Sequence, residues 1–186
     1  MNRTLINFIA FQAGWFSCVL SAANGIPWLG LLLVGLIVVL HIRAADQPRH
    51  ELQLLAWCLG LGLVFDSLLV SSGWVSYPSG MLVPGIAPYW ILAMWALFSI
   101  TLNLSMGWLK SNLALASVMG AVFGPLSYLA GQRLGAIELV DPRSSLIALA
   151  VIWALVMPIL THAARRLDDV RKLAPLVPMQ KLPGTD

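Results

Sequence analysis

Charged side chains are scarce in this chain of 186 residues. Only 10% of the residues are Asp, Glu, Lys or Arg, against about 25% in ordinary soluble domains, whereas 59% are hydrophobic. A soluble fold could not bury that much apolar surface, so this class is excluded. The formal charge of +3 does not indicate nucleic acid binding, because the basic residues lie at the ends of hydrophobic runs and not in a cluster with aromatic residues.

The chain also lacks the residue patterns of a metal or redox site. Its two cysteines, Cys18 and Cys58, have no metal-ligand spacing, and packing inside helices is the expected role. The three histidines, His41, His50 and His162, match no helical metal pair and are expected near the membrane boundary. We therefore expect no metal and no cofactor. No nucleophile is accompanied by a base and an orienting group, so nothing in the sequence establishes an enzyme.

Hydrophobic runs long enough to cross a membrane make up most of the chain. Charged or turn-like breaks divide them into the ranges 5–23, 27–42, 52–72, 88–108, 113–132 and 145–163. The predicted fold class is therefore an all-α membrane protein with six transmembrane helices in one domain, residues 1–164. Residues 165–186 are predicted to form a basic amphipathic extension, ended by Pro175, and a disordered tail. The first range also resembles a secretory signal, so cleavage and a first span both remain open.

The basic residues indicate an orientation. With six spans, nine of the 11 Lys and Arg residues fall on the face that holds both termini, and Arg133 and Arg143 fall on the other. The positive-inside rule then places both termini in the cytoplasm. The uncharged 24–26 and 73–87 connections would face outward. An aromatic belt is expected at that outer boundary, formed by Trp28, Trp74, Tyr77, Tyr89 and Trp90.

Asp66 is the one acid that lies deep inside a hydrophobic run. A carboxylate there costs about 2.5–3.5 kcal/mol on insertion scales and needs hydrogen bonds or a counter-charge. Counting from the middle of each span places Ser127 and Tyr128 at its depth, with Gln132 and Arg133 one turn further out. A bond between helices, a substrate or ion contact, and proton-coupled chemistry all remain open. With no second acid or histidine at this depth, acid/base catalysis has little support.

The third and fifth ranges resemble each other. Gly, Val, Phe and Leu match without gaps when residues 62–68 are set against 120–126. Such matches are frequent in apolar sequence, so chance and a parallel repeat of helical hairpins, spans 2–3 and 4–5, both remain open. In this alignment Gly124 stands opposite Asp66. Pro125 beside it and Pro158 predict helix kinks.

Four strings carry a resemblance to a known family: residues 12–16 (QAGWF), 65–69 (FDSLL), 89–98 (YWILAMWALF) and 124–136 (GPLSYLAGQRLGA). They resemble the bacterial membrane family catalogued as domain of unknown function 2878. The resemblance extends to about Ala164 and implies a bacterial inner-membrane protein, with no assigned activity.

A weaker similarity concerns residues 60–69 and the loop with 77–80 and 83–85. They are similar to the substrate-binding subunits of energy-coupling-factor vitamin transporters and to MreD-type membrane proteins. The resemblance implies six spans, cytoplasmic termini and a small molecule bound from the outer face. Two departures are that Ala13 and Ser17 only approximate the helix-contact motif and that the outer loop has no charge for a charged vitamin.

Three functions follow as hypotheses. The first is binding or transport of a small apolar or amphipathic molecule through an outward vestibule near Asp66, lined by Trp74, Tyr77 and Trp90. The second is an accessory subunit that assembles with membrane partners through glycine faces, such as those of Gly60 and Gly62. The third is an enzyme acting on lipid, which would need three or more polar side chains converging on Asp66.

Overall fold

The computed structural model describes the backbone of residues 2–173 and the side chains of residues 2–168. Six α-helices form most of this described part, and the chain is an all-α membrane protein, as predicted. The helices are α1 (Arg3–Ala23), α2 (Trp28–Ala44), α3 (Pro48–Ser71), α4 (Tyr89–Ser99), α5 (Leu113–Arg133) and α6 (Pro142–Leu173). A 3₁₀ helix, η1 (Gly107–Ser111), precedes α5, and two short strands, β1 (Val75–Ser76) and β2 (Glu138–Leu139), complete the fold.

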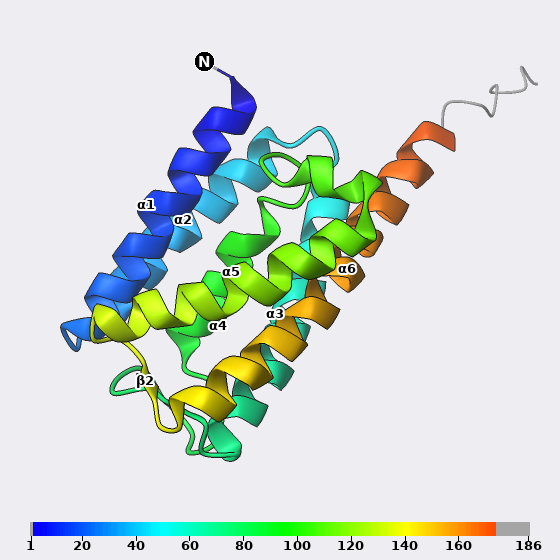
Figure 1. Cartoon of the computed structure of the whole chain (residues 1–186). Helices are drawn as coiled ribbons and strands as arrows, with labels where there is room; N and C mark the ends of the chain where they lie inside the picture. Colours follow the sequence, from blue (N-terminus) through cyan, green and yellow to red (C-terminus); the bar gives the residue numbers. More distant parts are fainter. Residues whose placement is uncertain (1, 174–186) are drawn as a thin grey trace, which may run out of the picture.

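The helices pack in two groups (Figure 1). The chain from α1 to α4 runs up and down, with α1 packed on α2 and both packed on α4, while α5 packs along α6. In Figure 1, α5 runs obliquely in front of α4 toward the last turns of α1. We call the end of the bundle where α1 and α3 begin the amino end. The opposite end, which carries β1 and β2, is called the strand end.

Four helices, α1, α3, α5 and the 142–168 part of α6, are long and apolar enough to cross a membrane by length and composition. Five of the six predicted ranges overlap helices, and α6 continues to Leu173, into the extension predicted after the last range. Both α5 and α6 run through their internal prolines as single helices. The tail prediction for residues 174–186 lies outside the described residues.

The prediction of a fourth helix over 88–108 was wrong in its length. The α-helix α4 has 11 residues, which gives about 16 Å of rise where the hydrocarbon core measures about 30 Å. Asn7 of α1 explains where it ends, because its side-chain amide donates to the Ile100 carbonyl at 2.9 Å. Asn7 also accepts from the Ser105 hydroxyl at 2.7 Å. The irregular 100–106 segment thus has backbone and side-chain bonds inside the protein, the condition for such backbone within a membrane.

Glycines let tryptophan rings enter the bundle. A Cβ on Gly62 of α3 would lie 2.3 Å from the Trp95 ring, and a Cβ on Gly124 of α5 would lie 2.3 Å from the Trp153 ring. Trp95 and Trp153 stack on each other, with centroids 4.9 Å apart and planes 6° apart. Each of the two helix pairs, α3–α4 and α5–α6, therefore has its own glycine–tryptophan contact. The predicted repeat, which pairs spans 2–3 with 4–5, stays a prediction.

The 73–88 segment folds over the strand end. Its strand β1 pairs antiparallel with β2, with Val75 opposite Leu139. The Ser79 hydroxyl donates to the Ala22 carbonyl at 2.8 Å, and the Ala87 amide donates to the Ser67 hydroxyl at 3.0 Å. These bonds tie the segment to α1 and α3 and so hold the residues beside Asp66.

Candidate functional site

Asp66 is enclosed by three neutral hydrogen-bond donors. It lies on the inner face of α3, 1% exposed. The Tyr77 hydroxyl donates to Oδ1 at 2.9 Å, and the Trp95 indole N–H donates to Oδ2 at 2.6 Å. The Tyr128 hydroxyl also donates to Oδ1. These four residues, the Asp66 cluster, join α3, α4, α5 and the segment after β1.

The local sequence explains this geometry. Gly62 lies one turn before Asp66 on the same face of α3, and its missing side chain leaves the space that Trp95 fills. Tyr77 reaches the carboxyl group because the chain turns back after α3 through β1. Each donor thus comes from a different element, and the carboxyl group fixes their relative positions.

The cluster holds a carboxyl group and leaves it little freedom to react. A general base needs an acceptor atom within reach of the substrate proton, about 2.6–3.2 Å away. All three polar neighbours of Asp66 instead direct their hydrogens at it, and its side chain is buried. The arrangement suits a fixed anchor between helices, satisfied as buried polar groups require.

The other residues proposed from the sequence are not all brought together. Trp90 lies against Tyr77, with ring centroids 5.7 Å apart, and its indole N–H donates to the Ser79 carbonyl. The Ser127 hydroxyl donates to the Gly124 carbonyl at 2.7 Å and does not contact Asp66. Gln132 is partly buried and Arg133 is exposed. The side chain of Trp74 is 39% exposed.

A cavity of about 570 Å³ adjoins the Asp66 cluster. It lies within the size range of small-molecule sites, about 300–1,000 Å³. Trp95 and Tyr128, two of the three donors to Asp66, form part of its wall. The remaining wall consists mainly of aromatic, methionine and small side chains of α1, α4, α5 and α6, among them Phe11, Trp15, Met94, Phe98, Met119 and Trp153. None of its lining residues is acidic, basic or histidine.

The cavity opens sideways onto the apolar surface of the bundle. Phe16 of α1 and Phe123 and Leu126 of α5 line it, yet they are 47%, 56% and 49% exposed. These side chains therefore stand at its mouth, between α1 and α5. No residue of the 73–88 segment lines the cavity. The vestibule over Asp66 at the outer loop stays a prediction, and this cavity lies beside Asp66.

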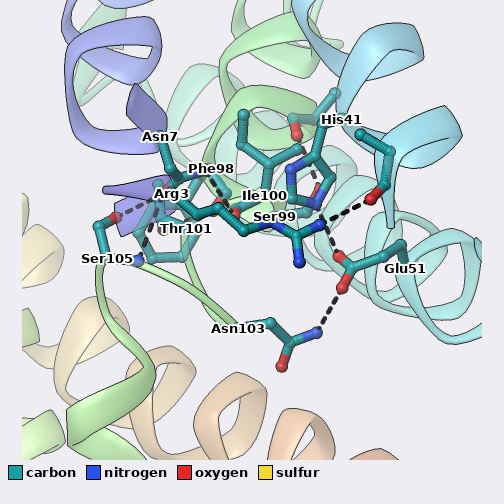
Figure 2. Close-up of polar contacts among 12 residues, drawn as sticks. Arg3, Asn7, His41, Glu51, Phe98, Ser99, Ile100, Thr101, Asn103 and Ser105 are labelled. Carbon is teal, nitrogen blue, oxygen red and sulfur yellow. Dashed lines mark hydrogen bonds and ion pairs between the residues drawn. The ribbon is translucent and has the colours of Figure 1, made fainter. Parts of the chain in front are cut away.

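A second polar arrangement lies at the amino end, part of which is drawn in Figure 2. His41 of α2 and Glu51 of α3 contact each other at 3.1 Å, and each side chain is 12% exposed. The Asn103 amide donates to Glu51 at 2.8 Å. Lys110 of η1 donates to Asn103 and, at 2.5 Å, to Asp168 of α6. These five residues form what we call the Glu51 network.

Sequence reasoning missed the Glu51 network and the role of Trp95. The sequence placed His41 near the membrane boundary without naming a partner for it. The short 45–47 connection brings α2 and α3 together, and Glu51 contacts His41. Gly62 was the available signal for Trp95, since a glycine one turn before a buried acid leaves room for a large ring. The described residues contain no group of three or more His, Cys, Asp or Glu that could hold a metal.

The comparisons with known proteins identify a family. Residues 4–159 match the family described as "Protein of unknown function (DUF2878)", and the chain belongs to it. No curated protein and no solved structure matches the chain. Membership therefore brings no activity, and function has to be argued from the site.

Proposed function

We propose that this protein binds a small apolar or amphipathic molecule in the cavity between α1, α4, α5 and α6. The observation that carries the proposal is an uncharged cavity of about 570 Å³ whose mouth opens on the apolar surface. A ligand dissolved in the bilayer would reach this mouth without passing through water. The excess of Lys and Arg on one face supports a bacterial inner-membrane location with cytoplasmic termini.

In this proposal Asp66 positions the cavity wall and does not touch the ligand. Its two carboxyl oxygens hold Tyr128 of α5 and Trp95 of α4 in place. Both rings face the cavity. The Trp95 ring in turn stacks on Trp153, a third wall residue from α6. Loss of the carboxyl group would therefore free three wall residues, Tyr128, Trp95 and Trp153, from their fixed positions.

Anthracene binding to the purified protein in detergent tests the proposal. Four tryptophans line the cavity, so energy transfer from tryptophan to anthracene reports on binding. Ala130 lines the cavity and Val122, on the same helix, is exposed and does not. We expect Ala130→Phe to weaken anthracene binding at least tenfold and the matched control Val122→Phe to leave it unchanged. Equal affinity in the two variants, both folded by thermal melting, would contradict a site in this cavity.

The accessory-subunit proposal loses part of its motivation. A Cβ on Gly62, Gly120 or Gly124 would lie within about 2.5 Å of an atom of Trp95 or Trp153, so these glycines serve packing inside the chain. A Cβ on Gly60 would meet nothing within 4 Å, so this glycine still supports the accessory-subunit proposal. The lipid-enzyme proposal required three polar side chains around Asp66. Three are present, two phenols and an indole, and all of them donate to its carboxyl group. Among the described residues, no histidine, thiol or second acid donates to or accepts from this carboxyl group, so we favour ligand binding over an enzyme.

A further inference from the structure

Gln12 brings a polar group into the cavity near the middle of α1. It is partly buried, lines the cavity, and its amide has no hydrogen-bond partner among the described residues. An amide without a partner in apolar surroundings is unfavourable. A partner that enters the cavity would therefore gain a hydrogen bond that the protein itself does not supply.

Most other polar atoms in the wall already have partners inside the protein. The Tyr128 hydroxyl and the Trp95 N–H bond to Asp66, and the Trp90 N–H bonds to the Ser79 carbonyl. The Ser127 hydroxyl donates its hydrogen to Gly124. The Ser127 and Tyr128 hydroxyls have already used their hydrogens, whereas the Gln12 amide keeps both a donor and an acceptor for a ligand.

The body of the cavity favours a flat or unsaturated hydrocarbon. Its wall carries the rings of Trp15 and Trp153 and the thioethers of Met94, Met119 and Met157. Aromatic faces and polarisable sulfur both interact favourably with π systems. A charged group would find no counter-charge on the lining and would lose its hydration on entry.

We infer that the ligand is a neutral, flat or polyunsaturated molecule with a carbonyl or hydroxyl group, and that Gln12 recognises that group. This inference rests on the proposed function, since it assigns the ligand class of the same cavity. The Gln12 N–H₂ donates to a carbonyl oxygen and its Oε1 accepts from a hydroxyl. Gln12 is a specificity residue, because the aromatic wall binds the hydrocarbon part without it.

Three probes of similar shape test the inference: anthracene, 9,10-anthraquinone and anthracene-9-carboxylate. The purified full-length protein in detergent is titrated with each by tryptophan fluorescence, and anthraquinone and the carboxylate are also measured by displacement of anthracene. One neutral hydrogen bond corresponds to about a three- to tenfold difference in affinity. We expect anthraquinone to bind tighter than anthracene by that factor, and the carboxylate to bind at least tenfold weaker than anthracene.

Gln12→Met keeps the length of the side chain and removes the amide. We expect this variant to bind anthracene within twofold of the wild type and to lose the preference for anthraquinone. A preference that persists in Gln12→Met, or that is absent from the wild type while anthracene still binds, overturns the role of Gln12 and leaves the cavity proposal standing. Failure of the wild type to bind anthracene at all overturns the proposed function itself.

Discussion

The Asp66 cluster and the Glu51 network each hold a carboxyl group inside the helical bundle, but the partners of the two carboxyl groups differ. Asp66 accepts from two phenols and an indole, all neutral, and is 1% exposed. Glu51 bonds to Asn103 and pairs with His41, and both members of that pair are 12% exposed. Lys110 and Asp168 continue the network toward the end of α6.

The partners differ because Asp66 is buried more deeply than Glu51. Burying an ion pair requires the desolvation of two charges, which the attraction between them offsets only in part. Neutral donors avoid the second desolvation, so they suit a carboxyl group between transmembrane helices. At the amino end the groups retain access to water, so the desolvation of charged partners is less unfavourable there. The neutral donors also add no charged group to the wall of the adjoining cavity, which suits the apolar ligand that we propose.

The largest expected effect comes from Asp66→Ala. It leaves three buried donors without an acceptor at once, and each such group is unfavourable by about 1–3 kcal/mol. Allowing for relaxation, we expect a loss of about 3–5 kcal/mol in the free energy of unfolding, measured by denaturant titration in detergent. Asp66→Asn keeps one carbonyl acceptor and should lose less. Wild-type stability in Asp66→Ala would show that the carboxyl group does not hold these helices together.

Glu51→Gln should have a smaller effect and one that depends on salt. The amide that replaces the carboxylate can still accept from Asn103 but no longer offers a carboxylate to His41. We expect a loss of about 1–2 kcal/mol, which becomes smaller as the salt concentration rises because a pair near the surface is partly screened. The loss in Asp66→Ala should be unchanged by salt, since its donors are neutral. A parallel salt response of the two variants would remove the distinction drawn between the two regions.

Tyr77→Phe and Tyr128→Phe separate the structural part of the Asp66 cluster from its cavity face. Each removes one donor to Oδ1, so each should lower the free energy of unfolding by about 0.5–1.5 kcal/mol. Tyr128 lines the cavity and Tyr77 does not. Anthracene titration should therefore show weaker binding in Tyr128→Phe alone. Equal binding losses would mean that Asp66 acts on the cavity through the whole cluster and not through its wall residues.

Depth counting along the helices predicted part of this arrangement from the sequence. It placed Tyr128 at the level of Asp66, and the Tyr128 hydroxyl donates to it. Arg133 was named by the same counting but is exposed, because one further turn and a long side chain bring it toward the interface. Counting gives depth alone. The rotation of a helix about its axis, which selects Trp95, depends on packing against Gly62.

The length of α4 could not be predicted from local pattern. Residues 88–108 are apolar enough for one helix, and the features that end it are contacts with another helix. Asn7 lies more than 90 residues away and takes the Ile100 carbonyl. The same applies to the Glu51 network, whose members come from five places in the chain. Apolar patterning predicts helices, whereas polar side chains within them select partners by tertiary contact.

Asp141 is an exposed carboxyl group just before α6, and its replacement should have the smallest effect on stability among these variants. A hydrogen bond from Ser144 holds the pKa of Asp141 below its ordinary value, with smaller contributions from backbone N–H groups. A depressed pKa in the folded state stabilises the fold above the unfolded pKa, about 3.9, and this contribution is lost as the pH falls further. We therefore expect Asp141→Asn to lower the melting temperature less than any variant above at pH 6. The difference from the wild type should vanish once the pH falls below the depressed pKa of Asp141. A difference that grows on acidification would contradict this sign, and a loss as large as that of Asp66→Ala would mean that burial between helices is not what sets Asp66 apart.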